Sequence, residues 1–133
     1  MKIKANAIGI DDPINVKGSV ANQDKADEML IKLLQISVNA DKQKIDDSKL
    51  NEKQKTQKAI EALQEERSFT KDAFLFLKNI LKLTDEQVEA AKEEVDFDGL
   101  GSYLNYVIGR LKGQSDEDLE LAKKVEEKDP KKE

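Results

Sequence analysis

Carboxylates and lysines supply most of the reactive groups of this sequence, because two other residue types are missing. Its 133 residues include 28 Asp and Glu and 23 Lys and Arg, but no His and no Cys. Zinc sites, thiol nucleophiles, disulfides and imidazole general bases are thereby excluded. What remains is acid–base work by paired carboxylates, or the binding of a hard cation by several of them.

One segment looks like a calcium loop at first sight. If Asp96 is the first ligand, Asp98 and Gly101 stand at the third and sixth positions that such a loop requires. Leu100 then stands at the fifth position, and Val107 at the twelfth, where the loop needs a bidentate Glu. The ligand set is incomplete, so we predict no metal site here and interpret Asp98 as a helix cap.

No pair of carboxylates stands out as catalytic. Runs such as Glu65-Glu66 and Glu126-Glu127 are typical of solvated helix faces. Gly99 and Gly101 lack the following glycine of a dinucleotide-binding loop. The formal net charge of -5 opposes nucleic-acid binding, which needs a concentrated basic surface. We therefore predict a protein that is not an enzyme, uses no cofactor and binds no nucleic acid.

The elements that must position a functional surface are mostly helices. Apolar residues recur at helical spacing in several segments, and two segments begin with capping sequences at Thr84 and Ser115. We expect helices over 24–38 with Asn22 as cap, 56–67, 68–82, from 85, 100–111 after a Gly-rich turn at 97–101, and from 116. The predicted fold class is mainly α, an elongated multi-helix domain with a short N-terminal extended arm or β-hairpin.

The chain divides into three expected parts. Residues 1–23 form an N-terminal arm, a strand pair or extended segment that either adds to a partner's sheet or packs on the chain's own helices. Residues 24–128 form the helical domain, whose polar segment 39–58 is a flexible linker or a solvated helix. Residues 129–133 form a disordered tail.

Apolar residues are concentrated between positions 69 and 111, although hydrophobic and charged residues each make up 38% of the whole chain. The helix over 68–82 carries them on two faces. One face belongs to the core, and the other is either core as well or a protein interface. The candidates for partner binding are large apolar and aromatic residues of this region: Phe69, Phe74, Leu77, Leu81, Phe97, Tyr103, Tyr106 and Val107.

The run FDGLGSYLNYVIGRLKGQSDED from Phe97 to Asp118, the MKIK start and the acidic, Lys-rich tail resemble the tail assembly chaperones of long-tailed phages (siphoviruses) of Gram-positive bacteria, in particular lactococcal phages. The similarity covers residues 70–133, and residues 1–69 only in layout. It implies a helical homo-oligomer of the host cytoplasm, absent from the mature virion. It also implies that the chain masks hydrophobic helical surface of the tape measure protein, with the tail tube protein as a second candidate partner.

A second interpretation stays open, namely a small helical adaptor or regulatory protein that binds one globular partner through the same face. Neither interpretation involves a membrane. The start of the chain lacks the apolar core of a signal peptide, and its longest apolar runs fall far short of about 20 residues. We therefore expect a soluble protein.

Overall fold

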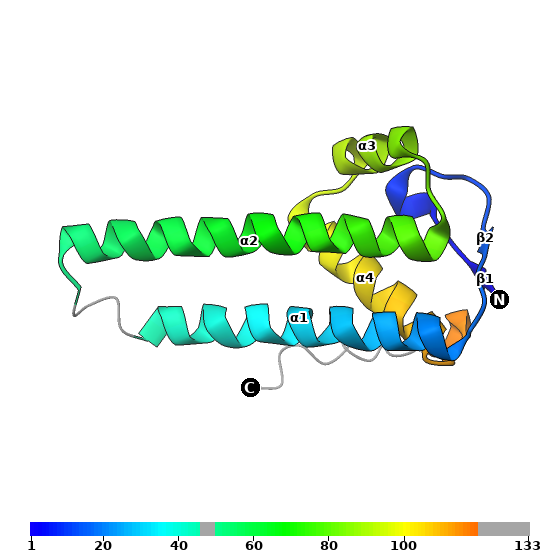
Figure 1. Cartoon of the computed structure of the whole chain (residues 1–133), viewed down its shortest axis with the longest axis horizontal. Coiled ribbons are helices and arrows are strands. Elements are labelled where there is room, and N and C mark those ends of the chain that lie inside the picture. Colours follow the sequence, from blue (N-terminus) through cyan, green and yellow to red (C-terminus); the bar gives the residue numbers. More distant parts are fainter. Residues whose placement is uncertain (46–49, 120–133) are drawn as a thin grey trace.

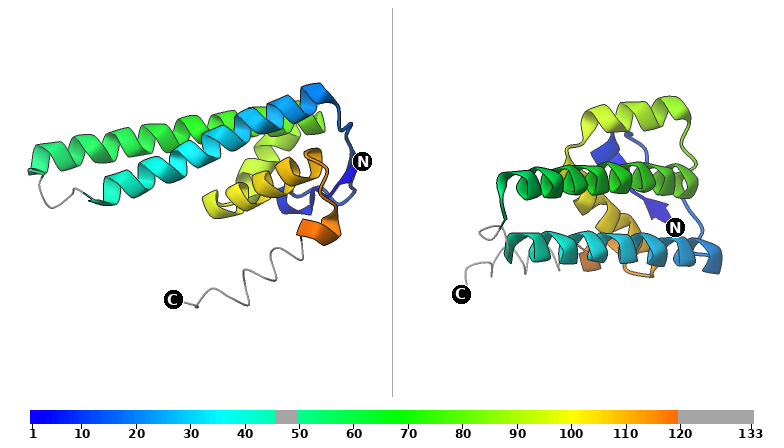
Figure 2. Two further views of the ribbon diagram at one scale, coloured as in Figure 1. Left: turned by 90° about the horizontal axis from the view of Figure 1, so that it is seen from below. Right: turned by 60° about the vertical axis from the view of Figure 1, so that its left-hand side comes forward.

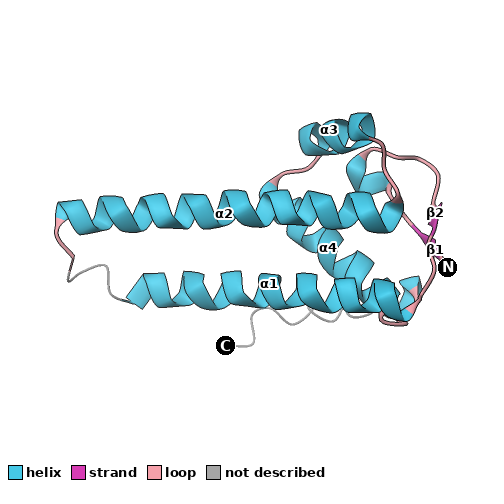
Figure 3. Cartoon of the chain, in the orientation of Figure 1, coloured by secondary structure: helices cyan, strands magenta, loops and turns pink. Residues whose placement is uncertain are grey.

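The chain folds into long helices with a small N-terminal sheet (Figures 1 and 3). The computed structural model describes residues 1–45 and 50–119. Its elements are β1 (Lys2–Ile3), η1 (Asn6–Ile8), β2 (Ile14–Asn15), α1 (Val20–Ile45), α2 (Glu52–Leu81), α3 (Asp85–Glu94) and α4 (Phe97–Leu111). The predicted fold class, mainly α and elongated with a short N-terminal hairpin, is confirmed.

Helices α1 and α2 form a long antiparallel hairpin, and the other elements gather at one of its ends (Figures 1 and 2). Helix α4 contacts both helices of this hairpin, whereas α3 lies along the outer side of α2 and contacts η1. Among the side chains whose burial is described, those buried in the hairpin lie toward this end, at Ala26 and Met29 in α1 and from Phe69 onward in α2. We call residues 30–39 and 52–68 the distal hairpin; none of its side chains is buried.

Helix α1 begins earlier than its apolar pattern predicts. Its first residue is Val20, and the Ser19 hydroxyl accepts a hydrogen bond from the Asn22 backbone N–H at 3.2 Å. The prediction that Asn22 caps the helix is therefore wrong, because Ser19 occupies that position. The Asn22 side chain instead donates to the Lys17 carbonyl at 2.8 Å.

Helix α2 is one continuous helix of 30 residues, where the sequence indicated two successive helices after a polar segment. Asn51 and Gln54 start it with a capping box, in which each side chain accepts the other residue's backbone N–H at 2.8 and 3.0 Å. Both α1 and α2 thus reach into the polar segment 39–58, which favours the solvated helix over the linker there. Of the positions between the two helices, 46–49 lie outside the described residues.

Two predicted capping boxes are confirmed. The Thr84 hydroxyl accepts from the Gln87 backbone N–H at 3.1 Å, and the Gln87 side chain accepts from the Thr84 N–H at 2.8 Å. Ser115 and Asp118 form the same pair of bonds at 3.1 and 3.2 Å, and a helical turn begins at Asp116. The remainder of the predicted last helix and the tail lie outside the described residues.

The start of α4 differs from the prediction. The helix begins at Phe97, and the Asp96 carboxylate accepts a hydrogen bond from the Gly99 N–H at 2.7 Å. The expected Gly-rich turn over 97–101 is therefore wrong, since this cap brings both glycines into the first turns of the helix. The cap is Asp96, and Asp98 lies inside the first turn.

The N-terminal arm packs on the chain's own helices. Strands β1 and β2 pair antiparallel, with Lys2 opposite Asn15 and Ile3 opposite Ile14. Four apolar side chains of the arm are buried, namely Ile3, Ala5, Ile8 and Val16. They belong to one core together with residues of all four α-helices. In the described ranges no helix is long and apolar enough to cross a membrane.

Candidate protein-binding site

The residues predicted to bind a partner do not share one exposed face. Buried in the core are Phe69, Phe74, Leu77, Leu81, Tyr103 and Val107. Phe97 is 41% exposed, and Tyr106 is half-buried. Partner binding by these residues stays a prediction, and only Phe97 and Tyr106 present substantial surface to a partner without a change in the fold.

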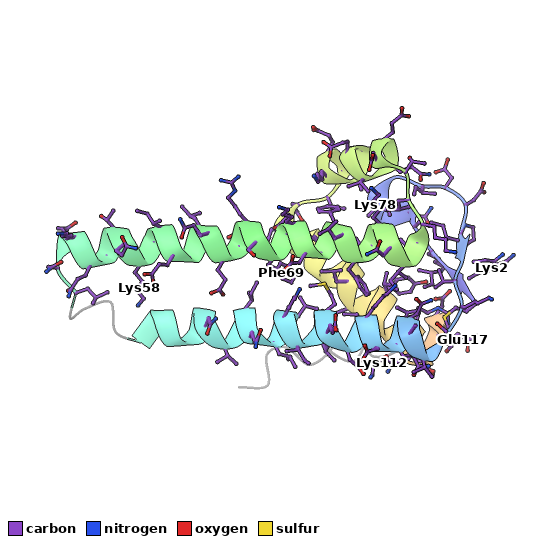
Figure 4. All side chains as sticks on the ribbon, viewed as in Figure 1. Lys2, Lys58, Phe69, Lys78, Lys112 and Glu117 are labelled. Atoms are coloured by element: carbon purple, nitrogen blue, oxygen red, sulfur yellow. The ribbon has the colours of Figure 1, made fainter. Side chains whose placement is uncertain are left out.

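The two apolar faces of α2 near its C-terminal end are both covered. Phe69 lies on the side that faces α1 and α4, and its ring centroid is 6.0 Å from that of Phe97 in an edge-on contact (Figure 4). Phe74 lies toward α3, where Lys92 Nζ is 5.9 Å from its ring centroid. Of the two alternatives for the second face, core therefore holds at Phe74 and Leu81.

Tyr103 and Tyr106 hold the N-terminal arm. The Tyr103 hydroxyl donates to the Lys4 carbonyl at 2.7 Å, and the Lys4 N–H donates to the Tyr106 hydroxyl at 3.0 Å. Arg110, on the same helix, donates to the Lys2 carbonyl at 2.8 Å. These side chains bond three backbone groups of Lys2 and Lys4 beside β1, so α4 covers much of the edge at which a partner's strand would pair.

The same tyrosines are kept protonated by their surroundings. Burial, followed by the neighbouring Tyr106, raises the pKa of Tyr103 above its ordinary value. Burial also raises the pKa of Tyr106, and the Asp116 carboxylate, which accepts from its hydroxyl at 2.7 Å, acts in the same direction. Both phenols therefore remain hydrogen-bond donors throughout the neutral pH range.

Most large exposed apolar side chains of the helices lie on the distal hairpin. They are Ile31, Leu34 and Val38 of α1 and Ile60 and Leu63 of α2, each between 42% and 60% exposed. The α1 residues recur after three and four positions, which places them on one side of the helix. The hairpin thus presents two apolar rows to solvent on a projection that has no buried side chain.

Polar contacts within the distal hairpin and next to it help to hold α1 and α2 together. Lys32 Nζ lies 3.1 Å from Asp72 Oδ2, and the Asn39 side-chain amide donates to the Glu65 carboxylate at 3.2 Å. The facing apolar residues Leu33 and Ile36 are only half-buried. The exposed rows are therefore not needed to join α1 to α2.

The sequence pattern missed this surface. It predicted a helix over 24–38 without separating an exposed apolar row from a buried one, and Leu34 and Val38 are exposed because no described element covers that side of α1. A helical wheel carries the missing signal. On it, Ile31, Leu34 and Val38 cluster away from the row of Met29, Leu33 and Ile36.

Two grooves border α2. The first, of about 550 Å³, lies between α2 and α3 and has Phe74 and Val88 in its lining. The second, of about 300 Å³, lies between α1 and α2 beside Ile36 and Phe69. We call the first the α2–α3 groove.

The α2–α3 groove has apolar side chains in its lining and charged groups around them. Among the described residues no group of three acidic side chains is placed to hold a metal ion. At the α2–α3 groove, Lys78 forms an ion pair with Asp85 and holds the pKa of that carboxyl below its usual value. The charged groups at this groove thus lie in pairs or at the rim, around apolar side chains that can accept an apolar partner.

A family model described as phage tail assembly chaperone proteins, TAC, matches residues 1–129. No curated protein and no solved structure matches the chain. The family match extends through the N-terminal arm and both long helices, well beyond the C-terminal half in which the sequence resemblance is found. It is a family of assembly chaperones and not of enzymes. The chain therefore belongs to the phage tail assembly chaperone family.

Proposed function

We propose that this chain binds hydrophobic helical surface of the phage's tape measure protein and masks it during tail assembly. The observation that carries the proposal is the pair of exposed apolar rows on the distal hairpin. A chaperone needs apolar surface for its client and charge elsewhere to stay in solution. The chain combines these rows with 38% charged residues.

Several further features belong to the same proposal. Copies of the chain self-associate and bind at repeated places along a long client, so weak single contacts gain strength from avidity. The tail tube protein is a second partner, because it replaces the chaperone around the tape measure protein. The chain acts in the cytoplasm of a Gram-positive host of lactococcal type, with no membrane or nucleic-acid ligand, and leaves before the virion is complete.

The test is co-expression with fragments of the tape measure protein. Replacing Leu34 and Leu63 with Asp places charge in both rows, and both residues are more than half exposed, so the fold is retained. The soluble fraction of the fragments should fall several-fold with this double variant. The measurement is the amount of fragment in the supernatant, with circular dichroism as the check on folding.

The matched control places the same charges beside the rows. Gln35 and Gln64 are exposed neighbours on the same two helices, and their replacement by Asp should leave client solubility unchanged. Equal protection by wild type and the Leu34 and Leu63 variant would remove the distal hairpin as the client surface. A fixed one-to-one complex at every fragment length would favour the adaptor interpretation over a coating chaperone.

A further inference from the structure

The α2–α3 groove is an open channel with an apolar floor. Phe74 and Val88 are buried in it from opposite helices, and Leu75 at its edge is 51% exposed. On α2 its lining runs from Glu66 to Lys78, which is about 18 Å of helix at about 1.5 Å per residue. A helix of three to four turns matches this length.

The charges at the groove fall into two groups. Lys78 pairs with Asp85 across the groove (Figure 4 labels Lys78 between the two helices), and Lys92 Nζ lies 3.1 Å from Glu89. These four groups neutralise one another. The other charged residues in the lining are Glu66, Arg67 and Lys71, all exposed.

The unpaired charge at the groove is positive in a chain that is negative as a whole. Within the described residues, neither Arg67 nor Lys71 has an ion-pair partner, and they stand four positions apart on one side of α2. Glu66 opposes only one of the two cations. An apolar partner that also carries carboxylates along one edge would therefore find both an apolar floor and a cationic rim.

We infer that the α2–α3 groove binds an amphipathic client helix whose apolar stripe is flanked by carboxylates, with the stripe on Leu75 and on the small exposed edges of Phe74 and Val88, and the carboxylates on Arg67 and Lys71. This inference rests on the proposed chaperone function and names the chemistry of the client segment that this groove selects. The groove floor is separate from the exposed apolar rows of the distal hairpin, although Glu66 and Arg67 of the groove lining stand at the last turn of that hairpin.

The experiment uses two designed amphipathic peptides of about 14 residues, which is about four helical turns. Both carry the same leucine stripe, flanked by Glu in one peptide and by Lys in the other, and binding to the full chain is followed by fluorescence anisotropy. Arg67→Glu plus Lys71→Glu reverses the rim. Lys53→Glu plus Lys55→Glu makes the same charge change on exposed residues of α2 outside the groove and is the matched control.

Wild type and the control should prefer the Glu-flanked peptide, and the Arg67 and Lys71 variant should bind it at least about fivefold more weakly. The same variant should gain affinity for the Lys-flanked peptide, which a merely misfolded chain would not do. Raising the salt concentration should weaken wild-type binding of the Glu-flanked peptide.

Unchanged preference in the Arg67 and Lys71 variant would overturn the inference. The inference would also fail if the Arg67 and Lys71 variant changed the oligomeric state of the chain but not its affinity for the peptides. The groove would then hold a second copy of the chain. If client protection fails only in the Leu34 and Leu63 variant, the chaperone proposal stands and the groove assignment falls. If it fails only in the Arg67 and Lys71 variant, the groove assignment stands and the distal hairpin is not the client surface.

Discussion

At the scale of single residues, three side chains of α4 take the place of a further strand beside β1. Tyr103, Tyr106 and Arg110 bond to the backbone groups of Lys2 and Lys4 that β2 leaves free. Aromatic type and helical position predicted a partner-binding role for the tyrosines, but their hydroxyl groups serve this strand. The backbone groups at the edge of β1 find their hydrogen-bond partners about 100 positions away in the sequence. The spacing of residues within one helix does not reveal such contacts.

Tyr103→Phe should destabilise the fold by about 1 kcal/mol, because it leaves the Lys4 carbonyl without its donor. The folded-state pKa of Tyr103 is raised, so its contribution is complete below the ordinary tyrosine pKa near 10 and is lost as the pH rises toward the folded value. Urea unfolding between about pH 8 and 11 should show wild type losing stability more steeply than the variant. Parallel pH profiles would contradict this role.

At the scale of elements, local signals predicted some helix starts and missed others. Thr84 and Ser115 cap as predicted because their partners lie three residues away in the sequence. The start of α4 was harder to predict because Gly99 and Gly101 favour a turn. In the structure the Asp96 cap allows the helix to begin before both glycines. The choice between Asp96 and Asp98 depends on a register difference of two residues, which periodicity does not fix.

Asp96→Ala should cost about 1 kcal/mol of stability, because the Gly99 N–H loses its acceptor at the start of α4. Asp98→Ala is the matched control. It removes the same charge one position inside the helix and should cost no more than about 0.5 kcal/mol through the helix dipole. Chemical denaturation of both variants measures the difference. A larger loss for Asp98→Ala than for Asp96→Ala would return the cap to the position predicted from sequence.

The candidate site was less predictable than the fold. Apolar periodicity identifies which residues of a helix are hydrophobic, but the side that neighbouring elements cover is decided by tertiary packing. Phe74 and Leu81 are covered, whereas Leu34 and Val38, with similar hydrophobic character, are not. The mainly α class followed from helical periodicity and capping sequences, and the polar character of residues 39–58 followed from their few apolar residues.

At the scale of the whole molecule, the core occupies one end of a long hairpin. The balance of equal hydrophobic and charged fractions in the sequence is an average over this end and the distal hairpin. The distal hairpin extends about 24 Å from Ser68 to Glu52 of α2 without a buried side chain. Its helical bonds therefore rely on capping, polar contacts and half-buried residues.

Amide hydrogen exchange should distinguish the distal hairpin from the end of the molecule that contains the core. Residues 30–39 and 52–68 should exchange at least about tenfold faster, after correction for intrinsic rates, than residues 73–80 and 103–108, because local opening there exposes little apolar surface. Mass spectrometry of peptic peptides resolves these segments. Equal protection of both groups would show that the distal hairpin opens only when the whole chain unfolds.

The continuity of α2 has a consequence for how this chain can vary. Leu63 of the distal hairpin and Leu75 of the α2–α3 groove lie on one uninterrupted helix, about 18 Å apart along its axis. Each residue inserted or deleted between them rotates one surface against the other by about 100°. Substitutions on the solvent side of this stretch leave the relative orientation of the two surfaces unchanged. A change in its length alters that orientation unless the change is close to a whole number of helical turns. The number of residues between Leu63 and Leu75 thus sets the angle between the two surfaces, and we expect insertions or deletions in this stretch to disturb binding more than substitutions on its solvent side.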